Sequence, residues 1–260
     1  MDIIGLIPAG GKATRISPLP CSKELFPLGL SPTDDGGLRP KAVATYLLEA
    51  MRTGGAKKAF FVIRQGKWDI PAYYGDGAML HMHIGYLLMN EPYGPPYTLD
   101  QAYPFVQNAI VAMGFPDILV EPLDAFAALV TELKKTEVDA VLGVFPNNSV
   151  HKWDPVELAP DGRITRIEIK PPASTLRHVW AIAVWSPRFT QFMHDYLAQR
   201  KPEFAAAYEA GIKKEIIVSD IMQAAIENGL NIRGVLFENG SCLDVGTPED
   251  LQKALKALYG

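Results

Sequence analysis

The sequence has little of what marks a secreted or membrane protein. It contains two cysteines, Cys21 and Cys242, in 260 residues, so nothing in it indicates a disulfide framework or an oxidising compartment. No apolar run approaches the roughly 20 residues of a membrane-spanning helix. The N-terminus lacks the basic and apolar regions of a secretory signal. We therefore expect a cytoplasmic protein without a membrane partner.

Blocks of like charge are also absent. The chain has 25 Lys and Arg against 29 Asp and Glu, a formal net charge of −4, which argues against a nucleic-acid partner. Its 48% apolar and 21% charged residues are ordinary for a globular protein. A chain of this length can bury a core that needs no covalent staples.

Apolar segments of strand length alternate with helical patterns as far as residue 145. The sequence predicts strands over residues 2–8, 58–64, 83–89, 109–113 and 139–145. It predicts helices over residues 41–53 and at about 99–107 and 122–135. This alternation predicts an α/β fold, a Rossmann-like mixed, mostly parallel sheet with helices on both faces.

The pattern changes after residue 145. Short strands are predicted over 156–158, 163–169 and 178–185, and we interpret them as a small β-rich insertion. Alternation in the second of these would place Glu168 and Lys170 on one face. Helices at about 187–199 and 217–228, a strand over 232–237 and a helix capped by Thr247 complete the chain. Residues 29–40 are interpreted as a surface loop, and 1–260 as a single domain.

A loop rich in glycine and cations follows the first predicted strand. Ligands of open α/β folds bind at the carboxyl edge of the sheet, where such a loop would lie. Gly10 and Gly11 let the backbone approach a ligand and direct amide hydrogens at it. Lys12, Arg15 and Lys23 add positive charge suited to phosphate oxygens. The loop is therefore predicted to bind a polyphosphate.

Two familiar phosphate-binding loops do not fit this stretch. In the frame of Lys12, a Walker A motif would need glycine where Leu6 stands and Ser or Thr where Ala13 stands. The dinucleotide pattern G-x-G-x-x-G is missing as well. The plain alternative, a glycine turn with an incidental basic residue, stays open at this point.

The stretch "AGGKATRISP…SKELFPLG" resembles the signature of the sugar-1-phosphate nucleotidylyltransferases, G-G-x-G-T-R-x-x-P followed by P-K-x-L-x-P. Its "SKELFPL" part is closest to the glucose-1-phosphate thymidylyltransferase branch. Further segments are similar to the family's later motifs and follow in the family's order: "RPKAVATYLLEAMRTGG", "AIVAMGFPDIL", "RITRIEIKPP", "EIIVSDIMQAAIENG" and "CLDVGTPEDL". The resemblance thus extends through most of the chain.

The resemblance implies transfer of a nucleotidyl group from a nucleoside triphosphate to a sugar 1-phosphate, giving an NDP-sugar and pyrophosphate. It also implies Mg²⁺ as cofactor, a homo-oligomer, and dTTP or UTP as the favoured nucleotides. By the same resemblance, residues 1–145 would form the nucleotide-binding half, and residues 146–260 the sugar-binding half with the C-terminal helices.

The resemblance also assigns roles to individual residues. The nucleotide would be held by Gly10, Gly11, Lys12, Thr14 and Arg15. Arg15, on the leaving pyrophosphate, and Lys23, on the α-phosphate or the incoming phosphate, would be catalytic. Mg²⁺ would be held by Asp117 and Asp244. The sugar phosphate would be bound by Lys170, Glu157 and Gly143.

Three positions depart from the family's pattern: Ala13 replaces the third glycine, Pro116 precedes the metal-binding aspartate, and Met89 occupies a segment that lacks the expected glutamine. These departures leave the nucleotide open and allow a non-catalytic paralogue that binds nucleotide or nucleotide-sugar. A glycosyltransferase of similar sheet topology is a second alternative, although the second carboxylate of its D-x-D pair is missing near Asp117. Transfer to a phospho-alcohol other than a sugar is a third.

Overall fold

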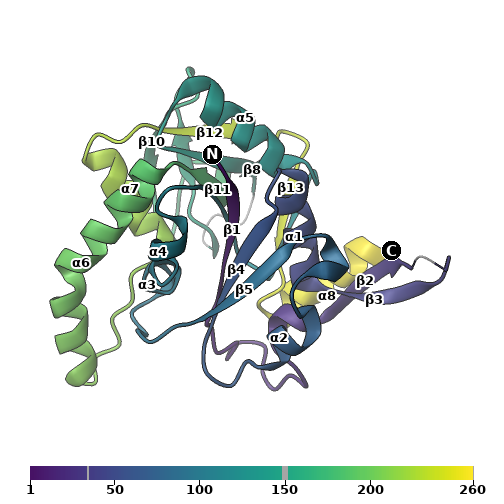
Figure 1. Cartoon of the computed structure of the whole chain (residues 1–260). Coiled ribbons are helices and arrows are strands. Elements are labelled where there is room, and N and C mark those ends of the chain that lie inside the picture. Colours follow the sequence, from purple (N-terminus) through teal and green to yellow (C-terminus); the bar gives the residue numbers. More distant parts are fainter. Residues whose placement is uncertain (34, 148–151, 260) are drawn as a thin grey trace.

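The computed structural model describes residues 1–33, 35–147 and 152–259. Within these ranges, a seven-stranded sheet in the order β12-β8-β11-β6-β1-β4-β5 forms the centre of the molecule (Figure 1). Its strands are β1 (Ile3–Ala9), β4 (Lys58–Ile63), β5 (His83–Leu88), β6 (Ile110–Gly114), β8 (Ala140–Pro146), β11 (His178–Trp185) and β12 (Ile232–Leu236). β11 runs antiparallel to both of its neighbours, and all other neighbours are parallel. The predicted mixed, mostly parallel sheet is confirmed.

Helices cover both faces of this sheet because its strands are apolar on both sides. In β1, Ile4 and Leu6 face the core shared with α3 (Pro95–Asp100), α4 (Tyr103–Val106), α6 (Pro187–Glu209) and α7 (Val218–Glu227). Ile7 and Ala9 face the opposite core, which contains α1 (Val43–Thr53), α2 (Asp69–Tyr74) and α5 (Ala125–Thr136). None of the helices within the described ranges is long and apolar enough to span a bilayer.

The strand over 178–185 does not belong to a β-rich insertion, as the sequence had suggested. It is β11, which lies inside the main sheet between β8 and β6, with Trp180 and Trp185 both buried. A nearly continuous apolar run is typical of a strand covered on both faces. Only β9 (Val156–Leu158) and β10 (Ile164–Ile167) form a separate two-stranded antiparallel ribbon at this point of the chain.

The predicted strand over 163–169 is too long. A register shift follows Ile164, and β10 ends at Ile167, so strict alternation is lost before Glu168. Ile169, which alternation would place on the same face as the buried Ile167, is exposed. Lys170 has a positive φ of 39° and donates its backbone N–H to Asp154. The expected common face of Glu168 and Lys170 is therefore not formed by a strand.

The segment over 29–40 is a hairpin and not a loop. β2 (Pro27–Pro32) pairs antiparallel with β3 (Leu38–Ala42), and the ribbon extends from the body of the molecule beside the C-terminal helix (Figure 1). That helix, α8 (Pro248–Tyr259), begins as predicted, since Thr247 Oγ1 accepts the backbone N–H of Asp250 at 3.2 Å.

Two helices differ from their predicted lengths. The helix expected at about 99–107 is two short helices, α3 and α4. The helix expected to end near 199 continues through Pro202 to Glu209 as α6. Two 3₁₀ turns, η1 (Lys23–Leu25) and η2 (Ala78–Leu80), complete the N-terminal half.

Candidate active site

A cavity of about 660 Å³ lies where four parallel strands end. It is lined by Gly10 and Gly11 after β1, Arg64 after β4, Met89 after β5, and Asp117 three residues beyond β6. Because β1 lies between β4 and β6, the glycine loop occupies the middle of this edge. The loop therefore lies where an α/β sheet of this kind binds its ligands.

The two glycines of this loop serve different ends. A Cβ on Gly10 would lie 2.2 Å from the sulfur of Met89, so a larger residue would force the loop away from β5. A Cβ on Gly11 would meet no atom within 4 Å and would project into open space. Gly10 thus permits close packing, and Gly11 leaves its backbone open to a ligand.

The chain then turns tightly at Ala13. Its carbonyl accepts hydrogen bonds from the backbone N–H groups of Ile16 at 3.1 Å and Ser17 at 3.0 Å. Ala13 has φ +53°, the left-handed conformation for which glycine is the usual residue. At the position where the resembled signature has its third glycine, this chain therefore holds an alanine in a conformation that favours glycine, at the cost of backbone strain.

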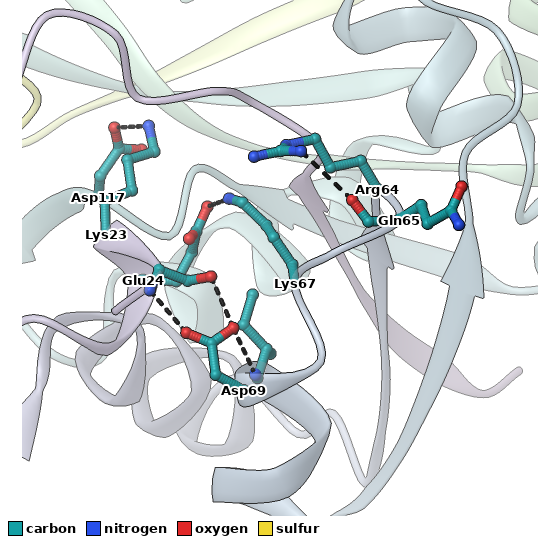
Figure 2. A network of polar contacts seen from close by, with 9 residues as sticks. Lys23, Glu24, Arg64, Gln65, Lys67, Asp69 and Asp117 are labelled. Atoms are coloured by element: carbon teal, nitrogen blue, oxygen red, sulfur yellow. Dashed lines mark hydrogen bonds and ion pairs between the residues drawn. The ribbon is translucent and has the colours of Figure 1, made fainter. Parts of the chain in front are cut away.

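Lys23 and Asp117 form an ion pair across the cavity, between η1 and the segment after β6 (Figure 2). The side chain of Asp117 is almost fully buried. Burial opposes the charge of the lysine, but the nearby carboxylates, chiefly that of Asp117, outweigh it and raise the pKa of Lys23. The lysine is therefore held in its cationic form, ready to meet an anion.

Asp244 is brought beside Asp117 by two short strands that the sequence did not predict. β7 (Ile118–Glu121) pairs antiparallel with β13 (Ser241–Asp244), in a register that sets Asp244 opposite Ile118. The backbone N–H of Val245 also donates to the carbonyl of Asp117 at 2.9 Å. Burial, followed by repulsion from Asp117, raises the pKa of Asp244. The nearby cations Arg15 and Lys23 offset part of this repulsion, and a metal cation between the two carboxylates would offset it further.

Arg15 reaches the same place from the glycine loop. Three charged groups surround Gly246: a Cβ placed there would lie 2.8 Å from Oδ1 of Asp244, 3.0 Å from Nη2 of Arg15 and 3.4 Å from Oδ2 of Asp117. Gly246 also donates its N–H to Asp244 at 2.7 Å. A side chain at this glycine would collide with the carboxylate of Asp244 and crowd Arg15, so its absence helps these groups to converge beside Asp117.

Two carboxylates suit a hard divalent cation. Mg²⁺ is commonly held by one or two carboxylates, with substrate phosphates and water completing its octahedron. The described residues contain no cluster of three or more His, Cys, Asp or Glu side chains placed to hold a metal by themselves. Asp117 and Asp244 therefore fit a cation that is shared with a phosphate ligand.

A network of buried polar contacts lies next to Lys23 (Figure 2). Next to it, Glu24 is fully buried and accepts a 2.6 Å hydrogen bond from Lys67, which is 4% exposed. Burial lowers the pKa of Lys67, although Glu24 opposes the shift. Ser22 donates its backbone N–H and its hydroxyl to Asp69, at 2.6 and 2.7 Å. These contacts fix η1 against the segment that follows β4.

Of the other residues expected in the site, Lys12 and Thr14 line the cavity and three do not. Gly143 lies within β8, where a Cβ would press on Ile182 at 2.6 Å, so packing accounts for this glycine. Glu157 lies on β9, exposed, and accepts the hydroxyl of Thr165 at 2.8 Å. Lys170 is exposed beyond β10. Asp220, weighed as a cap or a site residue, caps α7 by accepting the N–H of Ile217.

Sequence reasoning missed three cations that line the cavity. Arg64 directly follows β4, so the argument that placed the glycine loop at the carboxyl edge would have placed this arginine there too. Lys213 and Lys214 lie between α6 and α7. No periodic pattern or motif marks this connection, so nothing in the sequence indicated that it reaches the site.

Comparison with known proteins agrees with this arrangement. The sequence profile of the nucleotidyl transferase family matches residues 4–259. The chain belongs to that family. Glucose-1-phosphate thymidylyltransferases of Streptomyces antibioticus and Streptomyces griseus are 25% and 24% identical over 256 and 250 residues. Each alignment covers 95% of this chain and 63% of the relative, so the chain spans less than two thirds of their length.

Solved structures share the fold. A Bacillus anthracis protein crystallised with sucrose superposes with a TM-score of 0.81 at 17% identity, over 98% of this chain and 95% of the other. A UDP-glucose pyrophosphorylase solved with UDP-glucose gives 0.75 at 18% identity, over 100% and 99%. The chain therefore has the same overall fold as these solved structures.

Proposed function

We propose that this chain transfers a nucleotidyl group from a nucleoside triphosphate to a sugar 1-phosphate. A phosphate oxygen of the sugar attacks the α-phosphorus, and the bond from that phosphorus to the bridging oxygen of pyrophosphate breaks. The protein needs no nucleophile for such a step. Its work is to bring two polyanions together and to stabilise charge on the transferring and leaving groups.

The observation that carries this proposal is the convergence of Arg15, Lys23, Asp117 and Asp244 beside a glycine loop at the carboxyl edge of the sheet. Such a set of charges suits polyphosphate chemistry, and membership of the nucleotidyl transferase family supports it. Two carboxylates placed to share a metal with a phosphate, next to Arg15 and Lys23, are what stabilising charge on transferring and leaving phosphates requires. We take this set as support for catalysis over the binding-only alternative.

In this proposal, Gly10, Gly11, Lys12 and Thr14 hold the nucleotide. Arg15 binds the departing pyrophosphate, and Lys23 meets the α-phosphate or the incoming phosphate. Asp117 and Asp244 would hold Mg²⁺, which when bound neutralises phosphate charge. Lys170 and Glu157 are proposed for the sugar phosphate on the resemblance alone, with Gly143 as a weaker candidate.

We further propose dTTP or UTP as the nucleotide and glucose 1-phosphate as the leading sugar, because the named relatives include thymidylyltransferases and a UDP-glucose pyrophosphorylase. A homo-oligomer is proposed on the same family grounds, and a cytoplasmic location on the composition of the sequence.

The test is pyrophosphate release with Mg²⁺ across several nucleoside triphosphates and a panel of sugar 1-phosphates and other phospho-alcohols, with Asp244→Asn alongside. We expect release that requires one particular pair of substrates and is lost in the variant. Release with a non-sugar phospho-alcohol would support transfer but replace the acceptor. Silence across the panel, with nucleotide still binding by calorimetry, would overturn the proposal in favour of a binding protein.

A further inference from the structure

Positive charge is concentrated at the cavity of this acidic protein. Two carboxylates line it, Asp117 and Glu215, against five cationic side chains: Lys12, Lys23, Arg64, Lys213 and Lys214. The whole chain carries a formal charge of −4. Two of the five cations, Lys213 and Lys214, belong to the connection between α6 and α7. This connection lies outside the glycine loop and its signature. Figure 1 shows α6 and α7 on the side of the sheet that also carries α3 and α4.

This connection is anchored next to the cavity. The backbone N–H of Ile216 donates to the carbonyl of Tyr93 at 2.9 Å. Gly94 approaches Ile216 so closely that a Cβ on Gly94 would lie 2.0 Å from the carbonyl oxygen of Ile216. The positive φ of Gly94, 117°, likewise favours glycine. Gly94 itself lines the cavity. The residues just before Ile216 are therefore held at the rim of the cavity.

Lys213 and Lys214 are available to a ligand there. Their present partners leave both amines accessible: Lys213 lies 3.5 Å from Glu215 at the cavity, and Lys214 pairs with Glu203 and lies 5.3 Å from the centroid of the Phe204 ring. The lysine side chains are 85% and 42% exposed. Exposed pairs of this kind are weak and screened by salt, so a ligand with several negative charges can compete for both amines.

Arg64 approaches the same cavity from the end of β4. In the part of the chain that the structure describes, its Nη1 donates only to the adjacent carbonyl of Gln65, at 3.3 Å (Figure 2). Its Nε is buried and has no hydrogen-bond partner within the described residues. A buried donor without a partner is costly. A phosphate oxygen in the cavity is the kind of acceptor that a guanidinium suits best.

We propose that Lys213 and Lys214 form a second phosphate-binding wall of the cavity, supplied by the α6–α7 connection, that captures the phosphate chain of the nucleoside triphosphate. The identification of the ligand as a nucleotide rests on the proposed function, whereas the preference for a polyphosphate rests on the charges alone. Because the wall acts through exposed charge, its contribution grows with the number of phosphates and declines with ionic strength.

The test compares Lys213→Gln/Lys214→Gln with Lys134→Gln/Lys135→Gln, a matched removal of two positive charges from exposed lysines in the last turn of α5. Binding of inorganic phosphate, pyrophosphate and tripolyphosphate is measured by calorimetry with Mg²⁺, at low and high salt. We expect the first variant to bind tripolyphosphate about 5- to 10-fold more weakly at low salt. The loss should shrink from tripolyphosphate to phosphate and nearly vanish at high salt, with the control variant unchanged.

Equal binding by the wild type and the Lys213/Lys214 variant at low salt would overturn the proposal, and so would a loss that persists unchanged in high salt, because that would indicate a disrupted loop. Absence of tripolyphosphate binding by the wild type would also overturn it. The outcome of this binding test is independent of whether the chain proves to be a transferase. A wild type that binds tripolyphosphate but releases no pyrophosphate from any substrate pair fails the transferase proposal and leaves the second wall standing.

Discussion

Replacement of Ala13 by glycine should stabilise this protein, although an alanine-to-glycine change usually does the reverse. Ala13 is held at φ +53° in the turn of the signature loop. A residue with a Cβ costs roughly 1–2 kcal/mol in that conformation. Glycine removes this cost but adds about 0.4–1 kcal/mol of freedom to the unfolded chain. The net expectation is a gain of about 0.5–1 kcal/mol.

For a chain of this size, that gain corresponds to a rise in Tm of about 1–4 °C. Scanning calorimetry of Ala13→Gly measures it directly. The matched control is Ala198→Gly, an exposed position in the interior of α6, where the right-handed backbone favours alanine. There, the same change should cost about 1 kcal/mol. The two variants should therefore move Tm in opposite directions.

A fall in Tm for Ala13→Gly comparable to that of the control would refute the reasoning, because it would show that Ala13 does not occupy the left-handed conformation. The signature loop would then be arranged differently from the structure, and the convergence of Arg15 with the two aspartates would lose its support.

Three further predictions follow from the site and its surroundings. Lys67→Met should lower the free energy of unfolding, measured by urea titration, by about 3–5 kcal/mol because it leaves Glu24 charged and buried. The double variant Lys67→Met/Glu24→Gln should recover much of that loss. Additive losses would mean that the two side chains are not coupled. Lys170→Ala should raise KM for the sugar phosphate about 10-fold, more than KM for the nucleotide; the reverse ranking would move the sugar phosphate elsewhere. Burial raises the pKa of Cys242 to about 12, so its thiolate is scarce at pH 8. Each rise of one pH unit should therefore speed the alkylation of Cys242 tenfold, as measured by mass spectrometry. Equal reactivity of Cys242 in the native and the unfolded chain would contradict this.

The N-terminal half of the fold could be predicted because its strands are continuous apolar runs separated by amphipathic helices. The run that forms β1 and the glycines after it located the site at the carboxyl edge without any structure. Asp117 also follows a strand that is easily recognised, but both it and Ala13 were singled out by the resemblance to the family signature.

Long-range pairing set the limit of sequence reasoning. β7 and β13 have four residues each, too few to show a period, yet their pairing is what brings Asp244 to Asp117. β11 was assigned to an insertion because antiparallel entry into a parallel sheet leaves no local mark. Lys213 and Lys214 lie in a connection that is anchored at the cavity by the hydrogen bond from Ile216 to Tyr93, a contact between residues far apart in the sequence.

The measurement that tests the central claim most directly is the turnover of Asp117→Asn with the substrate pair that the wild type uses. The substitution preserves shape while it removes a carboxylate of the proposed Mg²⁺ site and the partner of Lys23. Pyrophosphate release at saturating Mg²⁺ should fall on the order of 100-fold or more, in a variant whose circular dichroism shows that it remains folded at the assay temperature. Turnover within a fewfold of the wild type would show that Asp117 takes no part in the chemistry, and would contradict the site described above.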